Sequence, residues 1–193
     1  MFAQVVLFDG FDPLDVIAPY EVLVAGGMAV SLVSAEGDRT VPSGLDHVAL
    51  TATADPQRAD LVIVPGAAGP LPEIPAILGR AAIGLAPLLK VAMDRPETTV
   101  ATVCGGSLLL AMAGLIAGRS ATTHHLGMEA LSANGVQAVD ARIVDDGDLI
   151  TAGGVTSGLD LGLYLLERFV SPRVAHDTGK FFEHERRGTV WAA

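Results

Sequence analysis

The chain has 193 residues, and half of them are hydrophobic, which is the size and composition of one globular domain with a substantial core. Its 12 Lys and Arg residues against 22 Asp and Glu residues give a net charge of −10. These charges are scattered singly, and so acidic a surface repels phosphate backbones, which excludes nucleic acid as an expected partner.

Cysteine usage and the first residues indicate the compartment. A single cysteine cannot form a disulfide within the chain, so nothing in the sequence points to an oxidising compartment. The opening segment MFAQVVLFDG has no basic residue ahead of its apolar run and reaches Asp9 early, which is typical of a first strand and not of a signal peptide. We therefore expect a cytoplasmic protein.

Apolar runs rich in β-branched residues alternate with helical patterns along the chain. This alternation predicts an α/β fold with a mostly parallel sheet covered by helices on both faces. No linker, repeat or low-complexity tract divides the sequence, so we expect one domain over residues 1–193. The strands are predicted at residues 3–8, 29–34, 61–64 and 98–103.

Helical and hairpin patterns occupy the first connections. Between the first two strands, Asp15 is a candidate cap for a helix that ends at the Gly26–Gly27 pair, with Pro19 in its first turn. Residues 41–54 alternate apolar and polar positions around turn residues, which predicts a hairpin. The next segment, residues 81–94, predicts a helix interrupted by a proline.

The second half continues in the same way. A short helix is predicted at residues 128–133, where Asn134 and a glycine end it, and the Asp146–Gly147 pair between two apolar runs indicates a hairpin. Two helices complete the chain. They are predicted at residues 156–170, with Thr156 or Ser157 as the cap, and at residues 171–187, with a serine cap followed by proline.

The segment from Thr98 to Gly118 carries no charged side chain and is long enough to span a membrane. Gly105 and Gly106 divide it, however, because β-branched residues precede them and Leu, Ala and Met follow. We therefore predict a buried strand, a tight turn and a helix, and no membrane span. Cys104 then lies in the turn at the carboxyl end of the strand, where open α/β sheets bind ligands.

This position suggests a nucleophile. The positive end of the following helix is expected to lower the pKa of the Cys104 thiol, and the Gly105 amide is expected to face an oxyanion. The alternative is a buried cysteine that acts as a small hydrophobic residue. A second turn, at Gly66 and Ala67 after the strand 61–64, is a candidate second donor to the same oxyanion, or else a plain turn.

Four ordered motifs carry a family resemblance: DPLDVIAPYEVL, VPGAAG, VCGGSLLLAMAGLIAGRSATTHH and LITAGGVTSGLDLGL. With them the chain, from Val5 to about Phe169, resembles the ThiJ/PfpI superfamily of the class I glutamine amidotransferase-like fold. Within it the chain looks most like the isonitrile hydratases and the related domain of some AraC-type regulators.

The resemblance implies catalytic roles. It implies that Cys104 attacks the terminal carbon of an isonitrile while Asp15 handles protons, and that a thioimidate is then hydrolysed to an N-substituted formamide. It also implies a small-molecule substrate, a homodimer and no cofactor or metal. His124 is a candidate base or thiolate partner, or else a structural histidine. Gly154 is expected to let the backbone approach the pocket, and Val155 to form its wall.

The sequence departs from relatives within the superfamily. Gly105 stands where the isonitrile hydratases usually carry threonine and where PfpI-type peptidases carry histidine. The late His and Glu of glutaminase members are two residues apart, whereas His184 and Glu185 are adjacent. Two alternatives to the hydratase stay open: a ligand-sensing or redox-sensing domain related to the AraC-type regulators, and glyoxalase or deglycase chemistry.

Overall fold

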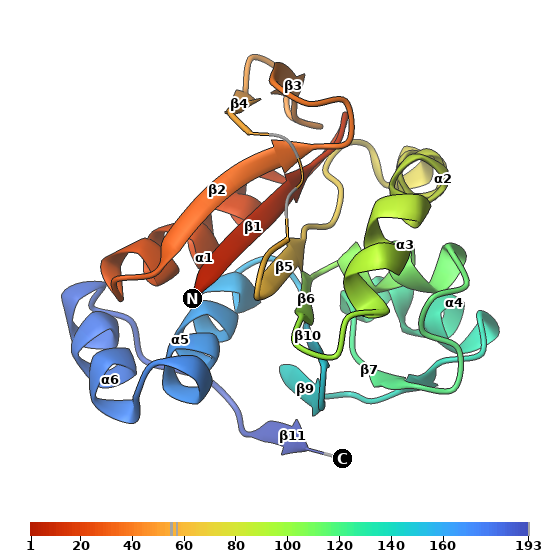
Figure 1. The fold of residues 1–193 in the computed structure, drawn as a ribbon. Helices are drawn as coiled ribbons and strands as arrows, with labels where there is room; N and C mark the ends of the chain where they lie inside the picture. Colours follow the sequence, from red (N-terminus) through yellow and green to blue (C-terminus); the bar gives the residue numbers. More distant parts are fainter. Residues whose placement is uncertain (55, 57, 193) are drawn as a thin grey trace.

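The computed structural model describes residues 1–54, 56 and 58–192, and its centre is a seven-stranded sheet (Figure 1). The strand order is β11-β9-β10-β6-β5-β1-β2, and β9 runs antiparallel to β10, whereas β10, β6, β5, β1 and β2 are parallel. The predicted mostly parallel α/β fold is therefore confirmed. The strands of this sheet are β1 (Phe2–Leu7), β2 (Ala29–Ser34), β5 (Leu61–Val64), β6 (Thr99–Val103), β9 (Ile143–Asp146), β10 (Leu149–Ala152) and β11 (Val190–Ala192).

Helices cover both faces of the sheet. On one face α1 packs against α5 and α5 against α6, while α2 and α4 pack against α3 on the other (Figure 1). The α-helices are α1 (Pro13–Ala25), α2 (Ile74–Met93), α3 (Gly106–Met112), α4 (Met128–Ala133), α5 (Ser157–Phe169) and α6 (Pro172–Phe181). Two 3-10 turns precede α2 and α4, at η1 (Leu71–Glu73) and η2 (His125–Gly127), and a small second sheet joins β7 (Ser120–Ala121) to β8 (Gln137–Ala138).

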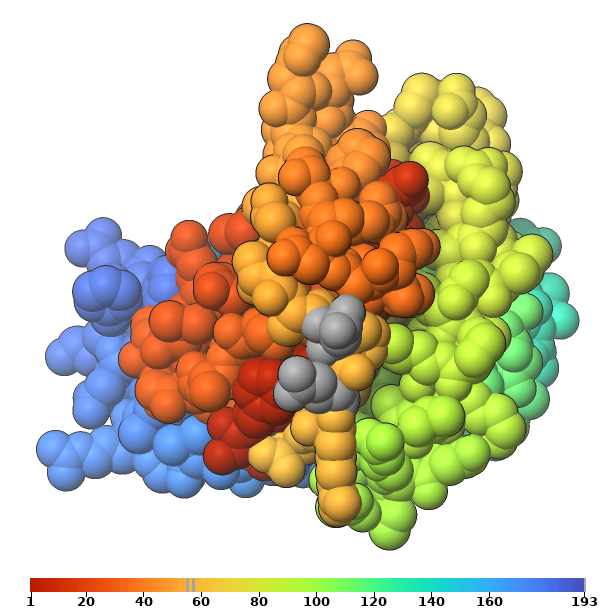
Figure 2. All heavy atoms as spheres, turned by 45° about the horizontal axis from the view of Figure 1, so that its top comes forward, coloured from red at the N-terminus to blue at the C-terminus, as the bar shows by residue number. Residues whose placement is uncertain are grey.

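Both predicted hairpins form. β3 (Arg39–Pro42) pairs with β4 (Ala49–Ala52) in antiparallel register, and β9 and β10 meet at the turn that contains Gly147. The loop between β3 and β4 stands out from the body of the molecule beside the start of α2 (Figure 2). The sequence did not predict β11, which pairs with β9 at the edge of the sheet.

The helix starts correct two of the expected caps. Asp12, and not Asp15, caps α1, because its side chain accepts the Leu14 N–H, and Pro13 takes the first helical position. Thr156 stands at the cap position of α5 without a capping hydrogen bond from its side chain. The expected serine cap of α6 is present.

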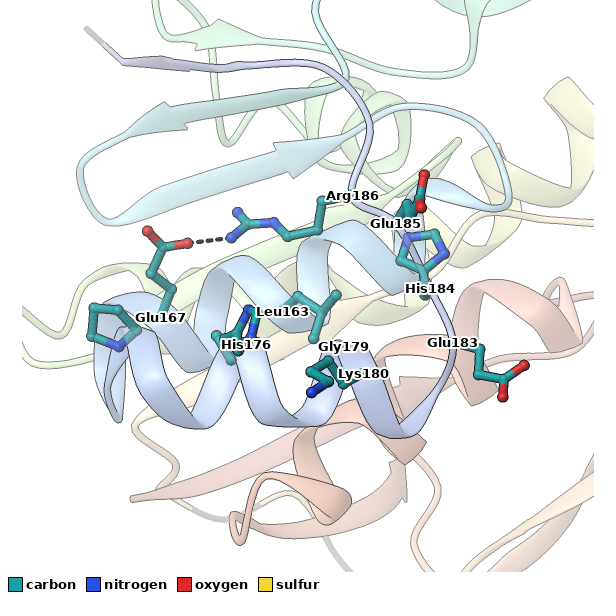
Figure 3. A pocket seen from close by; sticks show the side chains of 11 residues that line it. Leu163, Glu167, His176, Gly179, Lys180, Glu183, His184, Glu185 and Arg186 are labelled. Atoms are coloured by element: carbon teal, nitrogen blue, oxygen red, sulfur yellow. Dashed lines mark hydrogen bonds and ion pairs between the residues drawn. The ribbon is translucent and has the colours of Figure 1, made fainter.

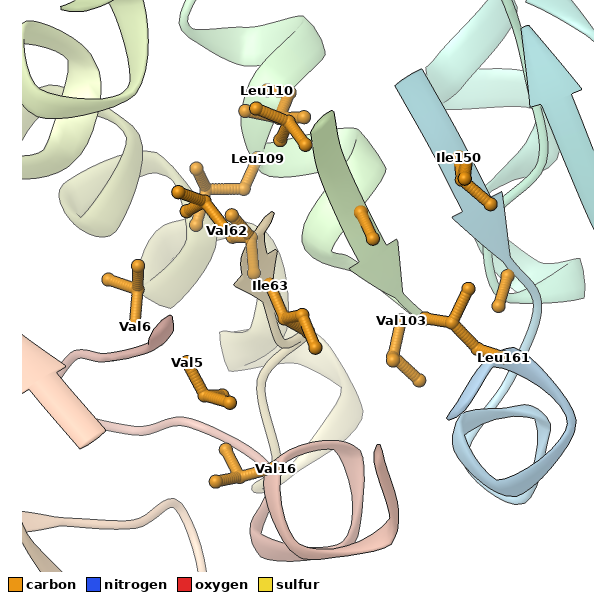
Figure 4. Packing of buried hydrophobic residues seen from close by; sticks show 14 of the residues in the cluster. Val5, Val6, Val16, Val62, Ile63, Val103, Leu109, Leu110, Ile150 and Leu161 are labelled. Carbon is orange, nitrogen blue, oxygen red and sulfur yellow. The ribbon is translucent and has the colours of Figure 1, made fainter. Parts of the chain in front are cut away.

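The core lies on both sides of the central strands. Every residue of β5 and β6 is buried, as expected for parallel strands that helices cover on both faces. In Figure 4, Val62 points toward Leu109 on α3, whereas Val5 points toward Val16 on α1. Successive residues of the strands therefore point to opposite faces of the sheet and pack against the two helical layers. This packing fixes the strands relative to one another and so places the loops at their carboxyl ends side by side.

The charge-free segment from residue 98 to 118 forms the predicted strand, turn and helix. A different stretch, Leu71–Met93, is the one among the described residues with the length and hydropathy to cross a membrane, and 39% of its most apolar window is buried. This stretch comprises η1 and α2. Its buried side chains, such as Ile77, Leu78 and Leu85, belong to the core of the domain.

Candidate active site

Cys104 occupies a strained turn between β6 and α3. Its φ of 55° lies in the left-handed region, which non-glycine residues rarely adopt. The surrounding backbone holds this conformation: the Cys104 N–H donates to the carbonyls of Ala152 and Gly153 at 3.0 and 2.9 Å. The Cys104 carbonyl accepts the hydroxyl of Thr123 at 2.8 Å. The turn is therefore built to present the thiol, as in a nucleophile elbow.

The glycines beside Cys104 allow backbones to approach one another. A Cβ on Gly106 would lie 2.2 Å from the carbonyl oxygen of Val64, and a Cβ on Gly66 would lie 2.6 Å from the amide nitrogen of Gly105. Side chains at these positions are excluded, which brings the turn after β5 against the elbow. The sequence prediction that the two strand ends converge on one site is consistent with this packing.

Asp15 lies fully buried on α1 beneath the elbow. Its Oδ2 accepts the Gly66 N–H at 2.9 Å, whereas Oδ1 has no hydrogen-bond partner of ordinary geometry. Burial raises the pKa of the Asp15 carboxyl well above its usual value, and the charge of Asp12 raises this pKa further, while the Gly66 amide and the Cys104 thiol lower it. Asp15 is thus held in its protonated form at higher pH than an exposed aspartic acid.

This contact corrects the role expected for Gly66. Its amide donates to Asp15 and is therefore engaged before any oxyanion forms. Ala67, the next residue, lines the cavity beside the thiol. Of the two expected donors in this turn, Ala67 stays the candidate.

The pKa of the Cys104 thiol is raised, whereas the sequence predicted that it would be lowered. Burial raises the pKa of Cys104 from 9.0 to about 12, and the charges of Asp15 and Asp12 add to this rise. The amides of Gly105 and Val155 donate hydrogen bonds to the sulfur and lower the pKa, but by less than the other effects raise it. The helix start therefore does supply donors to Sγ, yet the buried and acidic surroundings decide the protonation state.

The thiol opens on a cavity of about 550 Å³ whose wall is mostly apolar. Its lining comes from the β3–β4 loop, the start of α2, the elbow, α3 and the segment around α4. The lining residues are Asp12, Leu45, Ala67, Ala68, Gly69, Leu71, Ile74, Pro75, Leu78, Cys104, Gly105, Leu108, Thr123, His124, Leu126, Gly127, Ala130 and Val155. Such a site suits a small apolar molecule with one reactive group.

His124 lines this cavity as a hydrogen-bond donor and not as a base. Its Nδ1 accepts the Leu126 N–H at 3.2 Å, so the proton of the neutral ring is on Nε2. Burial lowers the pKa of His124, and the neighbouring His125 lowers it further, which favours the neutral ring. The ring lies over Gly154, where a Cβ would come within 2.6 Å of Cδ2, so the expected close approach at Gly154 is to His124.

The structure brings most of the predicted residues together. Cys104, Asp15, Gly66 and Gly105 are in mutual contact, and the remaining predicted residues, apart from Gly154, line the cavity. Apart from Val155 and Ala67, sequence reasoning missed the apolar wall, in which Leu78 packs against the elbow, with Cδ1 3.1 Å from the place of a Gly105 Cβ. The helical spacing of the apolar residues in α2 predicts that Leu78 is buried but does not predict that it lines a cavity. Among the described residues, no cluster of three or more His, Cys, Asp or Glu side chains has the geometry of a metal site.

A second cavity, of about 670 Å³, lies between α5, α6 and the segment that follows α6 (Figure 3). Its lining shares no residue with the cavity at Cys104. His184 lies here and pairs with the buried Asp160, which also pairs with Arg142. Asp160 thus connects α5 to distant residues through an ion pair with Arg142 and a hydrogen bond to His184. His184 and Glu185 line this second cavity and not the cavity at Cys104.

The sequence of the chain matches a known protein family. The model of the DJ-1/PfpI family matches residues 2–168. The chain belongs to the DJ-1/PfpI family. It is 35% identical over 172 residues to an isonitrile hydratase from Pseudomonas putida, covering 85% of this chain and 70% of that protein.

Two further comparisons concern one Drosophila melanogaster family member. The chain is 25% identical over 185 residues to the protein dj-1beta, covering 92% of this chain and 94% of that one. The crystal structure of Drosophila melanogaster DJ-1beta superposes with a TM-score of 0.82 at 22% identity, over 95% of this chain and 98% of that one. At this identity the superposition shows the shared fold. This DJ-1/PfpI chain is therefore similar both to an enzyme and to proteins whose names state no reaction.

Proposed function

We propose that the protein hydrates apolar isonitriles to N-substituted formamides, with Cys104 as nucleophile and Asp15 as the group that transfers protons. The observation that carries the proposal is the buried pair itself: a carboxyl in contact with a thiol that opens on an apolar cavity, both groups with raised pKa values. The similarity to an isonitrile hydratase supports the same reaction.

A neutral acid beside a neutral thiol suits the chemistry of an isonitrile. The terminal carbon of R–N≡C carries a lone pair and accepts a proton, after which it is open to attack. In the first step the Asp15 carboxyl protonates this carbon, Sγ of Cys104 forms a bond to it, and the thiol proton passes to Asp15. The product is a thioimidate, Cys–S–CH=N–R, and Asp15 has regained the proton it gave.

Water completes the reaction. It adds to the thioimidate carbon, one proton of the water goes to nitrogen through Asp15, and the C–S bond breaks as the sulfur regains a proton. The products are R–NH–CHO and the free thiol, so one water is consumed per isonitrile. The amides of Gly105 and Val155 stabilise the sulfur while it carries negative charge, and we assign Ala67 the role of donor to the oxygen of the tetrahedral intermediate.

His124 fits this scheme as a donor. With the proton on Nε2, the ring can donate a hydrogen bond to the thioimidate nitrogen or to the product carbonyl, but its one lone pair is engaged with the Leu126 amide. It therefore does not take the thiol proton in the ground state. Asp15 is the proton acceptor in contact with the sulfur.

Incubating the purified protein with cyclohexyl isocyanide and following N-cyclohexylformamide tests the proposal. Cys104→Ala is expected to abolish turnover, and Asp15→Asn to lower kcat by at least about 100-fold, since general acid–base catalysis contributes roughly that much. A chain that makes no formamide, or makes it equally well without Cys104, would contradict the proposal. Lactate formed from methylglyoxal would instead indicate glyoxalase chemistry.

We also infer a cytoplasmic homodimer. The family resemblance and the acidic, disulfide-free composition support it. Light scattering behind a sizing column tests the oligomeric state, for which a mass of 19.8 kDa would mark the monomer.

A further inference from the structure

Asp12 brings a charge to the cavity that contains Cys104. Asp12 lines this cavity, and among the described lining residues it is the one acidic residue, with no Lys or Arg in the lining to pair with it. The second titratable side chain that lines the cavity besides the thiol is His124, whose lowered pKa favours the uncharged ring. The cavity is therefore apolar with one negative charge at its edge.

The position of Asp12 is fixed by two hydrogen bonds beside the elbow. Its Oδ1 accepts the Leu14 N–H at 2.9 Å, which caps α1. Its own N–H donates to the Gly66 carbonyl at 3.0 Å, while the Gly66 N–H donates to Asp15. The carboxylate cannot leave the site without breaking the helix cap.

The field of Asp12 reaches the reacting atoms. Its negative charge raises the pKa values of both Asp15 and Cys104. Arg142 is paired with the buried Asp160 of α5, and neither of the charged residues of α1, Asp15 and Glu21, lines the cavity. Nothing in the described lining compensates this charge for an anionic ligand.

We propose that Asp12 makes the active-site cavity selective for neutral and cationic substrates and excludes those that carry a carboxylate or a phosphate. This deepens the proposed function, on which it rests for the nature of the reaction, because it restricts the isonitrile to one without an acidic group. Capping needs one oxygen of the side chain and leaves the charge free for this second role.

A matched pair of reagents tests the proposal without any turnover. Cys104 is the one cysteine of the chain, so alkylation by iodoacetamide (neutral) and iodoacetate (anionic) reports on this site alone. Because both reagents react with the same thiolate, the ratio of their rate constants does not depend on the fraction of thiol that is ionised. Dividing this ratio by the same ratio for free N-acetylcysteine corrects for the intrinsic reactivities of the two reagents. We expect this quotient to favour iodoacetamide by roughly 10-fold or more, as unscreened repulsion at short range in a protein-like dielectric implies, and by less in high salt.

Two variants assign the effect. Asp12→Asn keeps an oxygen that caps α1 equally well, and it is expected to bring the quotient close to one. Glu21→Gln removes the same unit charge from an exposed position of α1 outside the cavity lining and is expected to keep the wild-type quotient. A wild-type protein that discriminates no more than N-acetylcysteine does, or a preference that Asp12→Asn leaves unchanged, would overturn the proposal.

A second comparison uses isonitriles. 4-Isocyanobenzamide and 4-isocyanobenzoate differ in charge but hardly in size, and the benzoate is expected to show the lower kcat/KM, with Asp12→Asn reducing the difference. If the benzoate is hydrated as well as the benzamide, the selectivity is refuted while the hydratase stands. If neither is hydrated but the alkylation rates behave as expected, the hydratase fails and the selectivity stands.

Discussion

Raising the pH above about 9 is expected to destabilise the folded protein through Cys104. In the folded chain its pKa is about 12, whereas the ordinary value is 9.0. Between these values the unfolded chain has lost the thiol proton and the folded chain has kept it, so the free energy of unfolding falls as the pH rises. Each pH unit in this window costs about 1.4 kcal/mol, and from pH 8.0 to 10.5 the loss amounts to about 2 kcal/mol.

Urea denaturation followed by circular dichroism at several pH values measures this loss. Cys104→Ser is the matched control, because it keeps a small polar group at the elbow that does not titrate in this range. The wild type is expected to lose about 2 kcal/mol more than the variant from pH 8.0 to 10.5. Equal losses would mean that the folded thiol titrates with its ordinary pKa, and the inference that burial and the two nearby carboxyls stabilise the neutral thiol would then be wrong.

Three further predictions concern the same site. Asp15→Asn is expected to lower kcat for hydration by at least about 100-fold. It is also expected to remove the loss of stability that the wild type shows as the pH rises above 3.8, because the raised pKa makes ionising this buried group unfavourable; melting temperatures at pH 4.5 and 7.5 measure it. Gly105→Thr is expected to cost about 1–3 kcal/mol, since its Cβ lies 3.1 Å from Leu78 Cδ1, and combining it with Leu78→Ala is expected to cost less than the two single changes together. Gly106→Ala is expected to cost about 3 kcal/mol or more, because its Cβ would lie 2.2 Å from a carbonyl oxygen at the end of β5, whereas Gly84→Ala, with open space around it in α2, is expected to stabilise by up to about 1 kcal/mol.

Much of the fold could be predicted because its signals are local. A run of β-branched residues ending in Cys104–Gly105–Gly106 specifies a buried strand and a sharp turn, and both are present. The cap of α1 could also have been found, since Pro13 favours the first helical position and therefore makes Asp12 the cap, which frees Asp15 for the site. The prediction of Asp15 as a cap was wrong because it rested on the capping preference of aspartate and did not consider that Pro13 marks the first residue of the helix.

Other features depend on contacts between distant parts of the chain. β11 follows a polar segment. Two hydrogen bonds to the Asp160 carboxylate, one with the His184 ring and one from the Arg187 amide, fix the position of that segment. No local pattern predicts that a strand of three residues will pair with β9 at the far edge. Leu78 fills the space beside Gly105, and this contact is equally hard to predict, because it joins the first half of α2 to the elbow, which lies far along the chain.

The thiol pKa shows how a correct local argument gave the wrong direction. The sequence placed Cys104 at a helix start, and the amides of Gly105 and Val155 do donate to its sulfur. That stabilisation is outweighed, because burial removes water from the sulfur and two carboxyls contributed by the start of α1 repel its charge. A thiolate nucleophile is therefore unfavourable until a proton acceptor is in place. In the proposed reaction an isonitrile carbon is such an acceptor, since it takes a proton before the sulfur adds. On this mechanism the acidic surroundings of Cys104 suit hydration of an isonitrile better than attack on an amide carbonyl.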